Sequence, residues 1–238
     1  MPPPSRLRAK VERVIEHAPG LRTLVLAPER LAPRFLPGQF LHLAIDPYDP
    51  SQHWPESRIF SIASSPAARE HLHVTFSVAG VFTQRMLSLK AGDEVWVKLP
   101  YGEFFVETSV EAPAVLVAGG TGVTPFVSLF SAAAAPKGPM HLLYGARSPE
   151  LLIYRDAVLE AAKRWPELKA TLFVETGALA GARQGRLGID DALVAAQGLG
   201  HADAAVYFLS GPPALVTYFQ QGLRENDVAP ERIRIDAW

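Results

Sequence analysis

Residues 58–66, RIFSIASSP, place unusual groups in a segment that reads as a strand. Ile59, Phe60 and Ile62 are apolar, as expected for a half-buried strand. Arg58 and Ser61, however, put a fixed cation and a hydroxyl on either side of an aromatic ring. A plain core strand does not need these groups, so the segment is a candidate binding element.

A glycine-rich turn in VLVAGGTGVTP is a candidate phosphate site. Glycines let a ligand approach the backbone amides, and the N-terminus of the following helix supplies unpaired N–H groups and partial positive charge. Thr121 or Thr124 can cap this helix, and Pro125 suits its first turn. The turn is neither G-x-G-x-x-G nor a Walker loop, and a tight strand–helix turn without a ligand is an equally good interpretation. The candidate residues are Gly119, Gly120, Thr121, Gly122 and Thr124.

Two further segments repeat this pattern. In YFLSGPPALV, a buried-looking strand ends at Ser210-Gly211-Pro212, where ligands of open α/β sheets bind, although a simple helix start is the favoured reading of this segment alone. In AGVFTQRML, Gly80 and Thr83 begin a short helix and are either an N-cap or a second phosphate contact. His71 and His73 alternate with apolar residues, which indicates the wet face of a strand rather than a metal site.

Composition excludes several classes of function. The chain has 238 residues, 48% of them hydrophobic and 20% charged, and a net charge of -1, so no overall basic field indicates nucleic-acid binding. It has no cysteine, which excludes disulfides, thiolate nucleophiles and cysteine-ligated iron–sulfur clusters within it. No signal peptide or membrane span is apparent, and we expect a cytoplasmic protein.

The periodicity predicts two domains of different class. Residues 1–110 contain six short strands that favour an antiparallel β-barrel, over 6–17, 21–28, 39–46, 58–65, 71–78 and 93–100, with a short helix at 81–89. Residues 111–238 alternate strands and helices, which predicts an α/β domain with a parallel sheet. Its expected strands are 114–120, 140–146, 169–176, 204–211 and 233–238, and its expected helices are 126–135, 157–165, 190–197 and 213–226.

The order of these motifs resembles the ferredoxin–NADP reductase superfamily of flavoprotein reductases. The motifs are PGQF at 37–40, RIFSIASSP, GVFT, PYGEF at 100–104, GGTGVTP, YGAR, SGPP and a terminal aromatic residue, and they cover nearly the whole chain. The resemblance implies that Arg58 pairs with a flavin pyrophosphate, Phe60 packs on the isoalloxazine and Ser61 hydrogen-bonds toward flavin N5. Phe60 departs from the usual tyrosine of the family. Matches at both phosphate-binding blocks favour FAD over FMN.

In the second half, the resemblance implies that the glycine turn cradles the phosphates of a nicotinamide dinucleotide and that Ser210-Gly211-Pro212 lies by the nicotinamide. Plant-type members have Cys at the position of Ser210 and Glu near the C-terminus, where Asp236 is the nearest acid in this chain. Trp238 is expected to shield the flavin, or else to pack at the domain interface. Glu175 would repel a 2′-phosphate and accept ribose hydroxyls, which favours NADH, whereas Arg147 can reach a phosphate.

These expectations give a defined set of residues. Expected to be catalytic are Ser61, Ser210 and Asp236, and no metal site is expected. Expected to bind cofactors are Arg58, Phe60, Ser61, Ile62, Gly80, Val81, Phe82, Thr83, Gly119, Gly120, Thr121, Gly122, Thr124, Arg147, Glu175, Gly211, Pro212 and Trp238.

The expected activity is transfer of a hydride from NAD(P)H to FAD and of electrons onward. Because the chain lacks cysteines and room for a cluster domain, we expect a separate acceptor, such as a ferredoxin or an oxygenase iron–sulfur component. Reduction of free flavin or ferric chelates is a variant of this hypothesis. The alternatives are an electron-transfer flavin subunit of a larger complex and a nucleotide-binding sensor without turnover.

Overall fold

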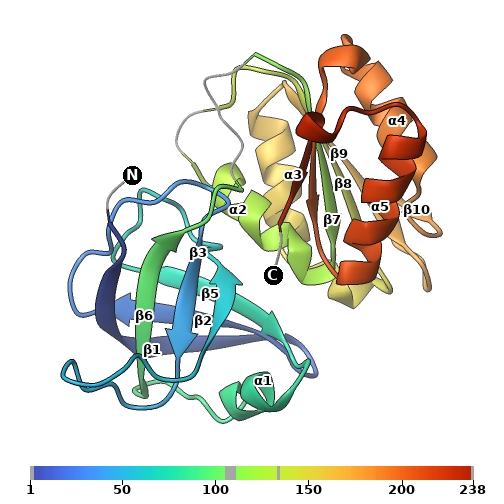
Figure 1. Ribbon diagram of the computed structural model, residues 1–238. Coiled ribbons are helices and arrows are strands. Elements are labelled where there is room, and N and C mark those ends of the chain that lie inside the picture. The colour runs from blue at the N-terminus through green and yellow to red at the C-terminus, as the bar shows by residue number, and fades with distance from the viewer. Residues whose placement is uncertain (1–2, 105–110, 133–134, 237–238) are drawn as a thin grey trace. The chain divides into compact units, whose positions relative to one another are not determined.

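The computed structural model describes residues 3–104, 111–132 and 135–236 (Figure 1). The chain divides into two compact units, Met1–Phe105 with Thr124–Ala132, and Val106–Val123 with Ala133–Trp238. None of the helices in the described ranges is long and apolar enough to cross a membrane.

The first unit is built on one antiparallel sheet of six strands in the order β4-β3-β6-β1-β2-β5. Its strands are β1 (Ser5–Ala18), β2 (Leu21–Pro28), β3 (Phe40–Ala44), β4 (Ser57–Ser61), β5 (Leu72–Ser77) and β6 (Glu94–Tyr101), and the helix α1 (Val81–Met86) lies between β5 and β6 in the chain. The sequence of β1 explains its two faces, because buried Leu7, Ala9 and Val11 alternate with exposed charged residues.

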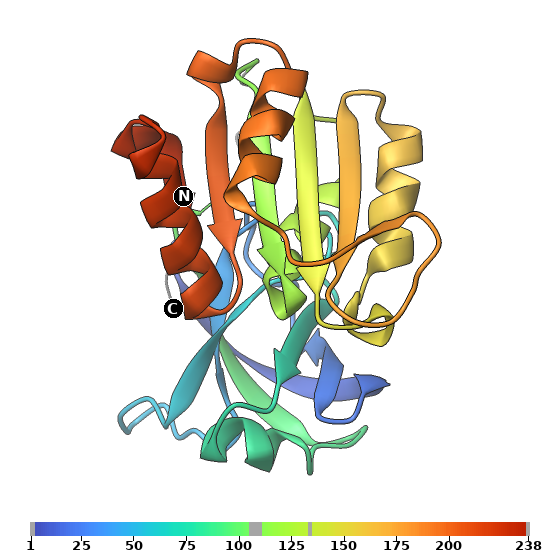
Figure 2. The same ribbon diagram turned by 90° about the vertical axis from the view of Figure 1, so that its right-hand side faces the viewer.

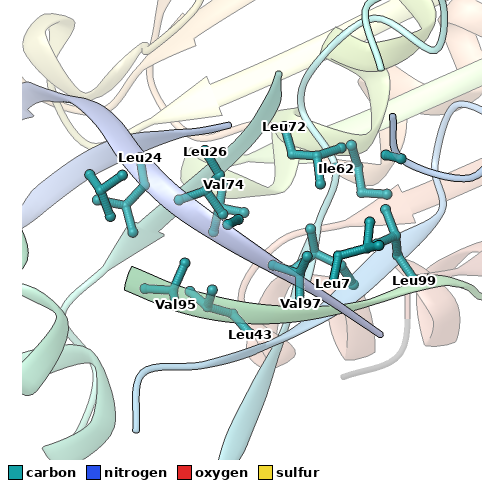
Figure 3. Close-up of a cluster of buried hydrophobic side chains, with 14 of the residues drawn as sticks. Leu7, Leu24, Leu26, Leu43, Ile62, Leu72, Val74, Val95, Val97 and Leu99 are labelled. Carbon is teal, nitrogen blue, oxygen red and sulfur yellow. The ribbon is translucent and has the colours of Figure 1, made fainter. Parts of the chain in front are cut away.

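The core of the first unit lies on the inner face of this sheet (Figure 3). Its labelled members are aliphatic, and each is almost completely buried. A single bridge between Ile62, which follows β4, and Val74 of β5 joins the two edge strands and brings the sheet close to a closed barrel. Burying each such side chain is worth about 1.5–3 kcal/mol, so the core fixes the position of β4.

The second unit contains a six-stranded sheet in the order β10-β9-β8-β7-β11-β12, and every neighbouring pair is parallel. The strands are β7 (Ala114–Gly119), β8 (Met140–Ala146), β9 (Leu168–Val174), β10 (Ala182–Gln184), β11 (Val206–Ser210) and β12 (Ile233–Ile235). Helix α3 (Arg155–Arg164) lies on one face, and α4 (Ile189–Gly198) and α5 (Pro213–Glu225) lie on the other (Figures 1 and 2). The strand order reverses between β7 and β11, which is where ligands bind in open α/β sheets.

Helix α2 (Thr124–Phe130) follows the glycine turn in the chain but belongs to the first compact unit. The Ser128 hydroxyl donates to the carbonyl of Ser64 at 2.8 Å, and the Ser65 hydroxyl donates to the carbonyl of Ser131 at 2.9 Å. The rings of Phe104 and Phe126 lie 5.8 Å apart. Polar and apolar contacts therefore both hold α2 against the loop that follows β4.

The predicted fold class is confirmed, with an antiparallel near-barrel sheet and a parallel sheet. Two element boundaries differ: β4 ends at Ser61 because the chain then pairs with β5, and α2 ends at Phe130, before the alanine run. Strand β10 was not predicted, because its three residues lack an apolar pattern. The proposed domain limits, 1–110 and 111–238, stay a prediction.

Candidate functional site

The β4 segment presents its unusual side chains on two different faces. Directly opposite residues of an antiparallel pair share a face, and Arg58 lies opposite Leu43 while Phe60 lies opposite Leu41, both of which are core residues. Ser61 lies opposite Phe40 and so points to the other face, where it is 8% exposed. A ligand that contacts both Phe60 and Ser61 must therefore pass the end of the strand.

Arg58 reaches the beginning of helix α1. Its guanidinium carbon lies 5.1 Å from the centre of the Phe82 ring, so the structure brings the two predicted flavin-phosphate blocks together. The side chain is 52% exposed and pairs with Glu56 at 2.8 Å. An ion pair this exposed contributes little, so an anionic ligand can displace the carboxylate at small cost.

The start of α1 is held by Thr83 rather than left open. The Thr83 hydroxyl oxygen accepts hydrogen bonds from the backbone amides of Ala79 at 2.9 Å and Gly80 at 3.1 Å. Phe82 is buried in the core, whereas Val81 is exposed. A Cβ at Gly80 would meet no atom within 4 Å, so the backbone there is accessible from outside.

Two residues near this block were missed by sequence reasoning. Arg85 of α1 pairs with Asp46 and with Glu56, so Glu56 lies between two arginines. Gln39 of the PGQF motif is 1% exposed, donates to the carbonyl of Gly102 at 3.0 Å, and accepts from the amide of Leu36 at 2.9 Å. Gln39 thus joins this motif to PYGEF, which a sequence shows only as two separate signatures.

In the glycine turn, most of the glycines are required by packing within the protein. A Cβ at Gly122 would lie 2.3 Å from the Ser210 carbonyl oxygen, and a Cβ at Gly119 would lie 2.7 Å from Leu215. Gly211 has φ +149 and approaches the backbone of Gly119. The turns after β7 and β11 therefore pack backbone against backbone.

Gly120 is different, because a Cβ there would meet nothing within 4 Å and its φ is +53. It remains the position in this turn where a ligand can approach the main chain. Thr121 is half-buried in the 3₁₀ turn Gly120–Val123, Thr124 is buried at the start of α2, and Pro212 is exposed at the start of α5.

Ser210 and Asp236 form a buried polar pair at the carboxyl ends of β11 and β12. The Ser210 hydroxyl donates to Oδ2 of Asp236 at 2.7 Å, and the two residues are 1% and 7% exposed. Burial raises the pKa of Asp236 to about 7, against which the Ser210 hydrogen bond acts only in part. The other oxygen, Oδ1, is buried without a hydrogen-bond partner among the described residues. A buried acid with this pKa can donate or accept a proton near neutral pH.

The loops after β8 and β9 are joined by hydrogen bonds and bring Arg147 and Glu175 together. The amide and hydroxyl of Thr176 both donate to the carbonyl of Arg147, each at 2.8 Å. Oε2 of Glu175 accepts from Nε of Arg186 at 3.0 Å, and Arg186 is 83% exposed. Sequence reasoning missed Arg186, which lies eleven positions beyond Glu175. The last predicted contact, Trp238, lies outside the described residues.

Comparisons with known proteins point in one direction. The family described as Oxidoreductase NAD-binding domain matches residues 116–221. A terephthalate 1,2-dioxygenase reductase component 1 from Comamonas sp is 31% identical over 240 residues, which cover 98% of this chain and 68% of that protein. A flavohemoprotein from Rhizobium meliloti is 30% identical over 149 residues, covering 59% of this chain and 36% of that protein.

A solved cytochrome P450 reductase from Amycolatopsis superposes with a TM-score of 0.81 at 24% identity, over 99% of this chain and 70% of that one. This likeness shows a shared fold. The chain thus spans between about a third and two thirds of the length of the curated relatives named above.

Proposed function

Because the chain belongs to the ferredoxin–NADP reductase superfamily, we propose that it is an NAD(P)H-dependent flavoprotein oxidoreductase. In this proposal residues 1–110 bind FAD and residues 111–238 bind the pyridine nucleotide. The observation that carries it is the contact of Arg58 with α1, because it joins two phosphate-binding blocks that are separate in the sequence. FAD supplies the ability to accept a hydride from a nicotinamide and to release single electrons.

The residues of the first unit fit this cofactor. Arg58 offers an exposed planar fork of donors for a pyrophosphate, and the open backbone at Gly80 lies on the helix that Arg58 contacts. Phe60 is half-buried against the core and offers a ring for packing, and the Ser61 hydroxyl offers a donor at the end of the strand. The distance between two phosphate contacts favours a dinucleotide, FAD, over FMN.

In the second unit, we assign the coenzyme phosphates to the backbone at Gly120 and the nicotinamide end to Ser210, Gly211 and Pro212. The switch point of the strand order, between β7 and β11, supports this assignment. We propose Ser210 and Asp236 as the catalytic pair, because their buried carboxyl group can hold or release a proton near pH 7. Trp238 is proposed to cover the flavin, so its deletion should change nicotinamide affinity and flavin fluorescence, and wild-type values would contradict this.

We propose that NADH is preferred over NADPH. The carboxylate of Glu175 stands beside Arg147 at the edge where the coenzyme ribose is expected, and it repels a 2′-phosphate. Arg186 reduces this repulsion by pairing with Glu175, so the preference is expected to be moderate. The ratio of kcat/KM for the two coenzymes measures it directly, and a strong preference for NADPH would refute the role of Glu175.

We propose a separate electron acceptor, a ferredoxin or an oxygenase iron–sulfur component. This proposal is supported by relatives whose names identify them as reductase components of dioxygenases and monooxygenases. The test is to purify the protein, record its absorbance spectrum, extract the flavin, and titrate anaerobically with NADH and NADPH. NADH-driven bleaching of bound FAD is expected, and a protein that stays colourless after incubation with FAD would refute the proposal.

A further inference from the structure

Three basic side chains form a row across the outer face of the first sheet. Lys98 of β6 lies directly opposite His42 of β3 on one side and opposite Arg6 of β1 on the other. The alternate residues of these strands, such as Leu43, Val97 and Leu7, belong to the core, so the three basic side chains point outward. Lys98 and His42 are half-buried and Arg6 is exposed.

The two fixed cations of this row are not neutralised. Among the described residues, no carboxylate lies within 4.0 Å of Arg6 or Lys98, whereas Arg8, two positions along β1, pairs with Glu29 and with Glu94. Like charges placed directly opposite each other on neighbouring strands destabilise a sheet. The row is therefore a local cost to the fold that the protein's own carboxylates do not relieve.

Aromatic rings hold these cations without cancelling their charge. Nζ of Lys98 lies 5.3 Å from the centre of the Tyr101 ring, and the guanidinium of Arg6 lies 5.5 Å from that of Tyr48. Tyr101 also stacks with Phe40 at 5.7 Å and meets His42 edge-on at 4.9 Å. Burial, with the charge of Lys98 as a second cause, lowers the pKa of His42 below its ordinary value, so its ring is neutral at pH 7.

The row lies near the proposed flavin contact. Ser61, Phe40 and Tyr101 are directly opposite one another across β4, β3 and β6, and they form the next rank of the same face. At the usual separation of neighbouring strands, β6 lies about 10 Å from β4, so Lys98 is close to the strand that carries Ser61.

We propose that the row His42–Lys98–Arg6, together with Tyr101, is the docking surface for a protein electron acceptor with an acidic surface around its redox centre. This inference rests on the proposed function and adds where the acceptor binds. Carboxylates of such a partner would relieve the repulsion between Arg6 and Lys98, and complementary charge also speeds association. Aromatic residues and arginine are the types enriched in protein interfaces.

A protein is favoured over the other anionic surfaces that cations recognise. Sequences that bind anionic lipid surfaces typically carry about four to eight clustered Lys and Arg residues, and nucleic-acid sites contact many phosphates. The row has two fixed cations set among rings, which suits a defined protein contact.

The test uses the full chain loaded with FAD and an acidic plant-type [2Fe–2S] ferredoxin as the probe. Isothermal titration calorimetry gives the Kd at two ionic strengths for the wild type, for Arg6→Glu/Lys98→Glu and for Arg6→Gln/Lys98→Gln. We expect the Kd to rise by about tenfold or more in the Glu pair and by less in the Gln pair, with a weaker dependence on salt in both. The matched control is Lys90→Glu, which reverses an exposed charge outside the row and should leave the Kd unchanged.

Wild-type affinity in both double variants would overturn the proposal, and so would an equal loss in Lys90→Glu, which would indicate an effect of net charge alone. Binding of the wild type to phosphatidylserine vesicles but not to ferredoxin would also overturn it, in favour of a membrane surface. FAD content and melting temperature report whether the variants are folded. NADH-driven bleaching of the wild-type flavin tests the proposed function separately, so bleaching without ferredoxin binding contradicts only the docking surface.

Discussion

Replacing Asp236 by Asn should remove a specific pH dependence of stability. The pKa of Asp236 rises from 3.8 to about 7 on folding, because the carboxyl group is buried. Between about pH 4 and pH 7 the unfolded chain has released this proton while the folded chain still holds it, so the free energy of unfolding falls as the pH rises. A shift of about three pKa units corresponds to roughly 4 kcal/mol, and most of it is lost by pH 8.

Asn cannot ionise, so the variant should lack this slope. It keeps an acceptor for Ser210 but buries an amide in place of the unpartnered Oδ1, which costs about 1–3 kcal/mol at every pH. The free energy of unfolding of Asp236→Asn minus that of the wild type should therefore increase by roughly 3 kcal/mol between pH 5 and pH 8. Urea unfolding at closely spaced pH values measures this difference.

The control for this experiment is Asp203→Asn, which removes an exposed carboxylate from the same unit. Its difference from the wild type should stay flat over the same pH range. If the curves of Asp236→Asn and the wild type run parallel, Asp236 does not change its protonation on folding. The assignment of Asp236 as a group that holds a proton near neutral pH would then fail.

Three further substitutions test other parts of the site. Arg58→Gln should raise the Kd for FAD roughly ten- to a hundredfold, because a charge-assisted hydrogen bond is worth about 1.5–3 kcal/mol; fluorescence titration of the apoprotein measures this, and an unchanged Kd would exclude a pyrophosphate contact. Glu175→Gln should raise the kcat/KM ratio of NADPH to NADH about tenfold, because it removes a repulsion and frees Arg186, and steady-state kinetics with both coenzymes would reveal an unaltered ratio if Glu175 has no role. Gly122→Ala should destabilise the protein by about 1–3 kcal/mol, because the new methyl group would lie 2.3 Å from the Ser210 carbonyl oxygen, and an unchanged melting temperature would show that the turn can move instead.

The fold could be predicted because its strands carry strong local patterns. In β1, apolar and charged residues alternate, and β7 is a continuous apolar run buried on both faces. Strand β10 escaped prediction because its pairing with β9, rather than its composition, makes it a strand. The assignment of α2 to the first unit also depends on distant contacts, such as Ser128 with Ser64, that no local pattern contains.

The candidate site was predicted in its parts but not in its connections. The sequence indicated Arg58 and α1 as separate blocks, and the structure shows their contact. It did not indicate that Gly119 and Gly122 serve internal packing while Gly120 stays open, because glycines look identical in a sequence. The partners Arg186 and Glu56 are charged surface residues, and only three-dimensional proximity distinguishes them from others of their kind.

Helix α2 has a consequence for how such reductases can be recombined. Its residues follow strand β7, yet it packs beneath the loop at Ser64 and Ser65. A chimera joined at residue 110 would give the flavin half a foreign helix, whereas a junction after residue 132 would divide the nucleotide half behind its first strand. The two halves are interlaced by a single helix, so no one crossover point can exchange them as intact modules.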